Sequence, residues 1–205
     1  MKVIAFNGSP HKDGVIQTGL DLMCGVLKQE GIETEIIQVG NEIIRGCVDC
    51  RKCRTLHKCA FDNDMVNSAA EKVNASSGII IGSPVYYGSI AGTFKCFLDR
   101  LFFSGLNLEY KAAAALVSCR RTGGINTFQQ MLNYFNLAKA FIVPSFYWGV
   151  IHGNNREELE EDKEGLQIAE TSAENMVWLL KALELAKKEI PLPGNAERVR
   201  TNFIR

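Results

Sequence analysis

The chain has 205 residues, of which 46% are hydrophobic, and its 23 lysine and arginine residues balance 23 aspartate and glutamate residues. This zero formal net charge argues against nucleic-acid and acidic-membrane partners, and no apolar run approaches the ~20 residues of a membrane span. Met1 leads directly into a short apolar run without the features of a signal peptide, so we expect a cytoplasmic protein with one main core.

Short apolar runs alternate with amphipathic segments along most of the chain. Apolar and β-branched runs predict strands over residues 2–6, 34–39, 78–81, 112–117 and 141–148. Apolar residues at helical spacing predict helices over residues 15–30, 65–75, 93–103 and 126–138. Strands joined by helices predict an α/β fold, an open five-stranded parallel sheet with helices on both faces.

The composition changes at the C-terminal side of this pattern. Residues 154–164 are acidic and predict an exposed linker, and residues 165–188 predict a helix with an apolar face. A Pro-Leu-Pro-Gly sequence then ends the helix and leads into an extended tail. Residues 1–153 thus form the predicted core domain, and residues 154–205 the linker, helix and tail. The apolar face can pack on its own sheet or against another subunit, and we favour assembly.

Four of the seven cysteines lie in one predicted insertion, residues 45–62, as Cys47, Cys50, Cys53 and Cys59 in the spacing C-x2-C-x2-C-x5-C. Four thiolates on one loop suit a tetrahedral zinc ion or an iron-sulfur cluster, and spacings of two between three successive cysteines favour the cluster. Structural zinc and a cysteine loop without metal are the alternatives. Disulfides are not expected in a cytosolic chain.

Three loops follow predicted strands, at the sheet edge where α/β proteins bind ligands. Residues 7–14 precede a helix, so their backbone amides can hold a phosphate, to which Ser9 adds a hydroxyl. This loop is neither G-x-G-x-x-G nor a Walker loop. Residues 82–92 place two tyrosines among glycines, which suits a flat heteroaromatic ring, and residues 118–124 combine arginines with glycines. The alternative for residues 7–14 is an ordinary strand-to-helix turn. For the tyrosines of residues 82–92 it is core packing, and for residues 118–124 it is a solvated basic turn.

Several motifs together carry a family resemblance. They are Phe6-Asn7-Gly8-Ser9-Pro10, the cysteine run ending Cys59-Ala60-Phe61-Asp62-Asn63-Asp64-Met65, Gly82-Ser83-Pro84-Val85-Tyr86-Tyr87-Gly88-Ser89, Lys95-x3-Asp99-Arg100, Trp148-Gly149-Val150-x-His152-Gly153 and Thr201-Asn202-Phe203-Ile204-Arg205. With these motifs the chain resembles the iron-sulfur flavoprotein branch of the NADPH-dependent FMN reductase superfamily. The resemblance implies a flavodoxin-like fold that binds FMN noncovalently. It also implies a [4Fe-4S] cluster on the four cysteines, near an FMN at a subunit interface.

The resemblance also implies which residues bind FMN, and it identifies no catalytic residue. The expected FMN-binding residues are Ser9, Pro10, His11, Gln17 and Thr18 at the phosphate, Pro84, Val85, Tyr86, Tyr87, Gly88 and Ser89 along the ring, and Arg120, Gly123 and Gly124 on the far side. The family commonly continues Gly-Asn-Thr in the first loop, whereas Gly14 is followed here by Val15 and Ile16. Ser9, Gln17 or Thr18 would then compensate, or FMN would bind more weakly.

The expected function is an FMN-dependent redox protein that transfers electrons between a [4Fe-4S] cluster and FMN. Ferredoxin or NAD(P)H is the expected electron donor, a small molecule the acceptor, and a homodimer or homotetramer the assembly. The alternatives are an NAD(P)H-dependent FMN or quinone reductase without a cluster, and a zinc-stabilised non-catalytic scaffold. Arg51, Lys52 and Arg54 would raise the cluster potential, dock an acidic ferredoxin or be merely solvated charges. His152 would lie near the flavin or serve the structure.

Overall fold

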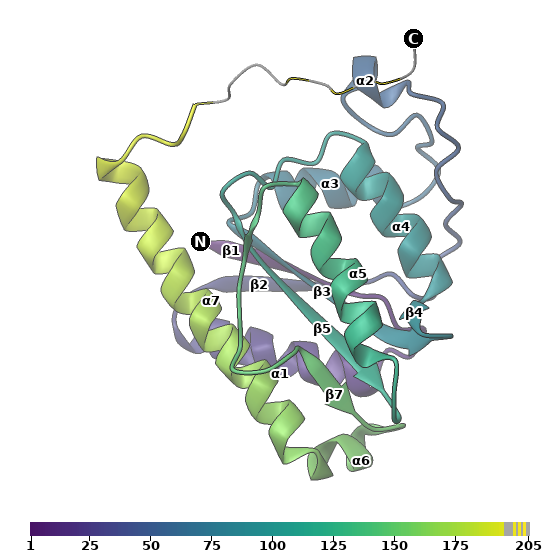
Figure 1. Cartoon of the computed structure of the whole chain (residues 1–205), viewed down its shortest axis with the longest axis vertical. Coiled ribbons are helices and arrows are strands. Elements are labelled where there is room, and N and C mark those ends of the chain that lie inside the picture. Colours follow the sequence, from purple (N-terminus) through teal and green to yellow (C-terminus); the bar gives the residue numbers. More distant parts are fainter. Residues whose placement is uncertain (195–198, 200, 202, 204–205) are drawn as a thin grey trace.

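Five strands form the centre of the fold, hydrogen-bonded in the order β2-β1-β3-β5-β6. Figure 1 labels β2, β1, β3 and β5. The computed structural model describes residues 1–194, 199, 201 and 203. These five strands are β1 (Lys2–Asn7), β2 (Glu33–Gln38), β3 (Gly78–Tyr86), β5 (Ala112–Cys119) and β6 (Phe141–Ile142). All four pairings between them are parallel. The predicted open five-stranded parallel sheet is therefore confirmed.

Helices cover both faces of this sheet (Figure 1). One face carries α1 (Val15–Gln29) and α7 (Lys163–Glu189), and the other carries α3 (Val66–Asn74), α4 (Gly92–Phe103) and α5 (Gly124–Leu137). Successive residues of β3 serve opposite faces, since Ile80 belongs to the core under α1 whereas Ile79 and Ile81 belong to the core under α4. Because both faces are buried, the central strands are apolar without alternation, as the sequence predicts.

The predicted fifth strand over residues 141–148 is wrong in its extent. The edge of the sheet is formed by β6 and by β7 (Val150–His152), which both pair with β5, and the chain between them leaves the sheet. The break begins at Pro144, which has no N–H to donate to a strand ladder. The chain rejoins the sheet where the N–H of Val117 donates to the carbonyl of Gly149 at 2.8 Å.

The predicted linker over residues 154–164 is exposed for most of its length and leads into α7, but it contains the unpredicted helix α6 (Arg156–Glu161). The side chain of Asn155 accepts a hydrogen bond from the N–H of Glu158 and caps the helix. Acidic residues in the first turn interact favourably with the helix dipole. The same charges that indicated a solvated linker in the sequence therefore stabilise a short helix.

The apolar face of α7 packs mainly within its own chain. Ala169, Met176 and Leu180 are buried in the core that α7 shares with α1, whereas Trp178 and Leu185 are exposed. Packing on the chain's own core thus covers most of this face, and assembly through the remaining apolar surface stays a prediction. Residues 195–198, 200, 202 and 204–205 of the predicted tail lie outside the described residues. None of the described helices is both long and apolar enough to span a membrane.

Candidate functional site

The first and third loops and the end of β3 meet in one cleft of about 890 Å³ beyond the carboxyl ends of β1, β3 and β5. The cleft is lined by Ser9, Pro10, His11, Lys12, Asp13, Gly14, Val15, Ile16, Pro84, Val85, Tyr86, Ser118, Cys119, Arg120, Gly153, Asn154, Asn155, Arg156 and Glu157. The chain passes from β1 outward to β2 and returns on the other side of β1 to β3. Such a switch in strand order is the usual ligand position in open α/β sheets.

Hydrogen bonds from Asn7 fix the shape of the first loop. The fully buried Asn7 side chain accepts from the N–H of Ser9 at 2.9 Å and donates to Gln17 Oε1 at 2.9 Å. Ser9 Oγ in turn accepts from the N–H of His11 at 3.1 Å. The Ser9 side chain therefore holds the loop that forms one wall of the cleft.

The N-terminus of α1 opens into this cleft without a cap. Among the described residues no side chain caps α1 at Gly14, and its first turn contains no acidic residue. The side chains of Asn155 and Asp162 cap α6 and α7, by contrast. Val15 and Ile16 of the first turn of α1 line the cleft. Uncapped amide N–H groups at the positive end of a helix dipole fit a phosphate, so this part of the chain suits the FMN phosphate.

Gln17 and Thr18 take up internal positions on α1. Gln17 accepts from Asn7 and donates to Asp21 Oδ1 at 3.0 Å, and the Thr18 hydroxyl donates to the Gly14 carbonyl at 3.3 Å. Neither residue lines the cleft. The structure thus gives them a part in holding the loop and the first turns of the helix, and direct phosphate contact by either stays a prediction.

The second loop is a tight hairpin between β3 and β4 (Ser89–Ile90). Its turn residues Tyr87 and Gly88 both have positive φ angles, of 51° and 72°, as a two-residue primed turn requires. Of the predicted ring-contacting residues, Pro84, Val85 and Tyr86 line the cleft. Tyr87 is fully exposed, the Gly88 carbonyl accepts from Asn126, and Ser89 donates to Gln130. The far half of the hairpin therefore faces α5 and solvent.

Arg120 of the third loop lines the same cleft. Gly123 has a φ of 90°, and a Cβ there would lie 3.0 Å from a methyl group of Val85. A Cβ on Gly124 would meet Val150 at 2.6 Å. Both glycines therefore allow the third loop to pack closely on neighbouring residues of the protein. From the sequence, we expected these glycines only to let the backbone approach a ligand.

His152 lies beside a smaller hollow that adjoins the cleft and contains Cys119, Gly123 and Trp148. Its backbone N–H donates to Asp162 Oδ2 at 2.6 Å, and its ring Nδ1 lies 3.4 Å from the same oxygen. Asp162 also caps α7. These contacts favour the structural role for His152.

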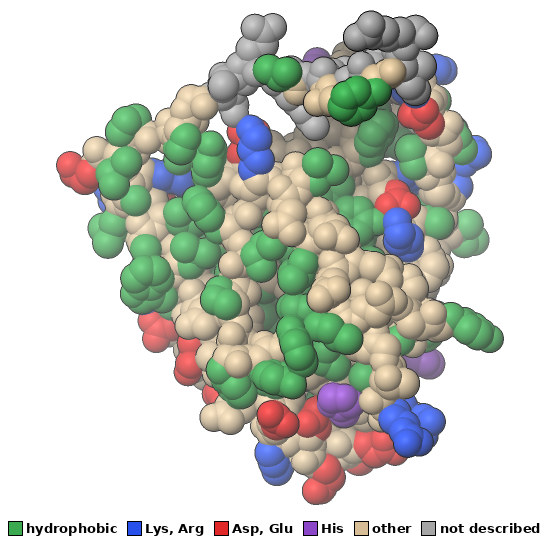
Figure 2. All heavy atoms as spheres, viewed as in Figure 1, with side chains coloured by type: hydrophobic (Ala, Val, Ile, Leu, Met, Phe, Trp, Pro, Cys, Tyr) green, Lys and Arg blue, Asp and Glu red, His purple; other side chains and the backbone are tan. Residues whose placement is uncertain are grey.

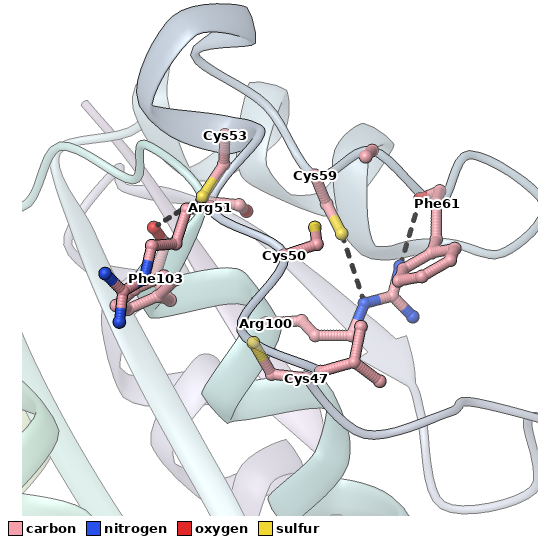
Figure 3. Close-up of a pocket in the computed structure, with 11 residues that line it drawn as sticks. Cys47, Cys50, Arg51, Cys53, Cys59, Phe61, Arg100 and Phe103 are labelled. Carbon is pink, nitrogen blue, oxygen red and sulfur yellow. Dashed lines mark hydrogen bonds between the residues drawn. The ribbon is translucent and has the colours of Figure 1, made fainter.

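All four predicted metal ligands line a second pocket, between the cysteine loop and the C-terminal end of α4 (Figure 3). Cys59 is buried, Cys53 at the start of α2 (Cys53–Leu56) is half-buried, and Cys47 and Cys50 are exposed. Asp49 and Arg51 have positive φ angles, of 48° and 58°, so the chain turns sharply on both sides of Cys50. These turns bring cysteines at spacings of two toward one space.

The donor set of this pocket fits a thiolate-bound metal centre. Burial raises the pKa of the Cys53 thiol, and the neighbouring Cys50, Cys47 and Cys59 raise this pKa further, as expected of four sulfurs in one place. His57 does not line the pocket. Within residues 1–194, 199, 201 and 203, no three histidine, cysteine, aspartate or glutamate side chains already stand at metal-binding positions. Four sulfurs, with no histidine or carboxylate among the lining residues, suit an iron-sulfur cluster or zinc.

The sequence did not indicate that Arg100 donates a hydrogen bond to one of these sulfurs. Its side chain is 1% exposed, and its Nε–H donates to Cys59 Sγ at 3.3 Å (Figure 3). Arg51, by contrast, is exposed and pairs with Asp49 at 2.9 Å. Arg100 belongs to the Lys95-x3-Asp99-Arg100 motif, but nothing in the surrounding apolar helix pattern marks it as a partner of a cysteine 41 residues away.

Comparison with known proteins places this arrangement in a family. The model of the NADPH-dependent FMN reductase family matches residues 1–155. An iron-sulfur flavoprotein of Methanocaldococcus jannaschii is 30% identical over 90% of this chain and 100% of its own length. One from Methanosarcina thermophila is also 30% identical, over 90% of this chain and 97% of its own.

Solved structures show the same fold at low sequence identity. RosB with a bound formylriboflavin phosphate intermediate superimposes with a TM-score of 0.73 at 16% identity, covering 99% of this chain and 92% of that one. An archaeal flavodoxin gives a TM-score of 0.54 at 14% identity, covering 85% of this chain and 99% of that one. The fold, the cleft and the sequence matches agree. The chain therefore belongs to the NADPH-dependent FMN reductase family, within its iron-sulfur flavoprotein branch, and is an FMN-binding, flavin-dependent oxidoreductase.

Proposed function

We propose that this FMN redox protein also carries a [4Fe-4S] cluster on Cys47, Cys50, Cys53 and Cys59 and passes electrons between the cluster and FMN. The observation that supports the proposal most directly is that all four cysteines line one pocket, with no histidine or carboxylate among its lining residues. When bound, FMN exchanges a hydride or two electrons and the cluster exchanges one electron at a time, so that the pair can connect the two kinds of partner.

Each cofactor would be held by different parts of the chain. For FMN, the uncapped first turn of α1 supplies amide N–H groups to the phosphate, and the end of β3 from Pro84 to Tyr86 supplies a wall for the ring. For the cluster, the cysteine loop supplies the sulfurs, and Phe61 and Phe103 supply apolar walls. Water would have least access to the buried Cys59, while Cys47 and Cys50 lie on the exposed side of the pocket.

The separation of the two sites within one chain supports assembly as part of the proposal. The two sites lie at opposite ends of α4. The β3–β4 hairpin, which contributes to the cleft, leads directly into the first turn of α4. At the last turn, the Cys53 thiol of the cysteine pocket donates to the carbonyl of Phe103. The twelve residues of α4 span about 18 Å at 1.5 Å per residue. A short path between cluster and FMN is then more readily made between subunits of a homodimer or homotetramer.

An exposed apolar surface is available for such assembly (Figure 2). Hydrophobic side chains gather there along α7 and beside α5, and Phe146, Tyr147, Trp148 and Trp178 are each at least 49% exposed. Exposed aromatic groups of this kind are common in protein interfaces.

Ferredoxin or NAD(P)H is the proposed electron donor. The exposed Lys52 and Arg54 near the cysteines suit an acidic ferredoxin.

A kinetic experiment tests electron transfer between the two cofactors. Reduced ferredoxin is mixed without oxygen with the wild-type protein and with a Cys59→Ser variant reloaded with FMN, and flavin reduction is followed by absorbance. We expect the flavin of the variant to be reduced at least tenfold more slowly, because its route through the cluster is missing. Equal rates would support the alternative of a reductase without a cluster. Membership in a flavin-dependent oxidoreductase family already excludes the non-catalytic scaffold.

A further inference from the structure

Arg100 is the most completely bonded charged side chain around the cysteine pocket. An arginine side chain has five N–H bonds to donate, and Arg100 makes five hydrogen bonds. Nε donates to Cys59 Sγ at 3.3 Å, Nη2 donates to the Phe61 carbonyl at 3.0 Å and to Asp64 at 3.1 Å, and Nη1 donates to the Arg45 carbonyl at 3.4 Å and to the other oxygen of Asp64. The guanidinium is therefore held in one orientation.

This orientation is maintained in the interior of the protein. The side chains of Arg100 and Asp64 are 1% and 9% exposed, and the guanidinium also lies 5.6 Å from the centre of the Phe61 ring. A buried ion pair contributes little net stability, because removing two charges from water offsets their attraction. Stability alone therefore gives a poor account of this arrangement, whereas the fixed N–H at a cysteine sulfur has a direct chemical use.

We propose that Arg100 is a positioning residue that raises the reduction potential of the cluster through its hydrogen bond to Cys59. This inference rests on the proposed function. Reduction of the cluster adds one electron and one negative charge without making or breaking a bond to the protein. An N–H donor and a buried positive charge at a ligand sulfur stabilise the more negative state, and hydrogen bonds to the sulfurs are an established determinant of cluster potentials.

Asp64 opposes Arg100 in this arrangement. Its carboxylate oxygens accept from Nη1 and Nη2, whereas Cys59 Sγ accepts from Nε, so Asp64 helps to hold the Nε–H toward the sulfur. Its negative charge, however, disfavours the added electron. The two partners of the ion pair should therefore shift the potential in opposite directions when each is neutralised separately.

This opposition separates tuning from a merely structural role. Arg100→Gln should lower the midpoint potential of the cluster, and Asp64→Asn should raise it. Each shift should correspond to at least a tenfold change in the equilibrium with a redox mediator, which is 59 mV for a one-electron couple. Both variants break the same ion pair, so a structural role would move stability and potential in the same direction for both. Arg54→Ala is the control, since its exposed charge is screened by solvent and should shift the equilibrium less than twofold.

The measurement is an anaerobic redox titration of the FMN-loaded protein, followed by the EPR signal of the reduced cluster. A wild-type protein without iron overturns the proposed function and this inference with it. A wild-type protein with a cluster, combined with shifts in one direction only or shifts no larger than that of Arg54→Ala, overturns the inference alone.

A measurement without variants at position 64 or 100 decides the question if those variants do not retain a cluster. Protein labelled with guanidino-¹⁵N arginine is reduced and studied by pulsed EPR, in an Arg51→Lys background that removes the exposed arginine of the pocket. We expect a nitrogen coupling that changes with the isotope. If no such coupling is seen, Arg100 does not donate a hydrogen bond to a sulfur of the cluster, and the inference is overturned.

Discussion

Gly123 packs directly against Gly88, and this contact joins the third loop to the turn of the β3–β4 hairpin. A Cβ placed on Gly123 would lie 3.3 Å from the Cα of Gly88 and 3.0 Å from a methyl group of Val85. Because Val85 lines the cleft proposed to hold FMN, the contact transmits the position of the third loop to the wall of the cleft.

Gly123→Ala should weaken both the fold and FMN binding. The φ angle of 90° is strained for alanine, at a cost of about 1–2 kcal/mol, and the added methyl group displaces Val85. We expect a lower free energy of unfolding in urea and a several-fold higher FMN dissociation constant by fluorescence titration. Gly25→Ala is the control, since a Cβ at this position in α1 meets no neighbour within 4 Å. It should stabilise the protein by about 0.5–1 kcal/mol and leave FMN affinity unchanged.

Asn7→Ala should loosen the first loop, residues 7–14. The substitution removes the acceptor for the Ser9 N–H and the donor to Gln17 at a fully buried position, which costs about 1–3 kcal/mol. We expect FMN affinity to fall at least tenfold, as measured by titration of the apoprotein. Asn175→Ala removes an exposed hydrogen bond to Pro144 far from the loop and should not change the affinity. Unaltered FMN binding in Asn7→Ala would contradict the role given to this loop.

The uncapped N-terminus of α1 predicts a strong preference for FMN over riboflavin. Riboflavin lacks the phosphate that would accept from the free amide N–H groups and interact with the helix dipole. We expect riboflavin to bind at least tenfold more weakly in a fluorescence titration at low ionic strength. Equal affinities for the two flavins would show that the phosphate lies elsewhere.

Cys59→Ser should remove bound iron without removing FMN. Cys59 lines the cysteine pocket and contributes nothing to the lining of the cleft proposed to hold FMN, so the two cofactors should be lost independently. The measurement is the iron and flavin content of the purified variant. Cys96→Ser is the matched control, because this half-buried cysteine of α4 does not line the pocket. Loss of iron from Cys96→Ser and not from Cys59→Ser would contradict the assignment.

The buried thiol of Cys24 should make the protein less stable at alkaline pH. Burial raises the pKa of its thiol from 9.0 to about 11 in the folded state, so the folded protein retains a proton that the unfolded chain releases. The resulting stabilisation is complete below pH 9 and is lost as the pH rises toward 11, and its size is on the order of 2–3 kcal/mol. Urea unfolding of the reduced protein between these pH values should show a shallower decline for Cys24→Val. Identical declines in the two proteins would exclude this thiol as the cause.

The sequence predicted the parts of this molecule that depend on local pattern. The apolar runs at β1, β3 and β5 and the helical spacing of α1 and α7 come from residues close together in the chain, and so does the cysteine spacing. The contacts that the sequence did not reveal join residues far apart. Arg100 reaches Cys59 and Asp64 only because α4 packs beneath the cysteine loop.

The same limit explains the errors at the edge of the sheet and after it. Residues 141–148 are apolar enough for a strand, but pairing beside β5 is interrupted at Pro144. The acidic residues of α6 have no helical pattern of their own, and that helix depends on the cap at Asn155. For Gln17 and Thr18, the folded loop adds the internal partners Asn7, Asp21 and Gly14, and their contact with the phosphate stays a prediction.

Metal and flavin analysis of the protein purified without oxygen shows whether the four cysteines hold an iron-sulfur cluster beside FMN. Iron, sulfide, zinc and FMN are measured in one sample, together with its ultraviolet-visible spectrum. We expect flavin bands over a broad shoulder near ~400 nm, with about four iron and four sulfide per chain, as a cluster held by four thiolates requires. Bound FMN with no iron, or with zinc in its place, would contradict the claim that Cys47, Cys50, Cys53 and Cys59 hold an electron-transferring cluster.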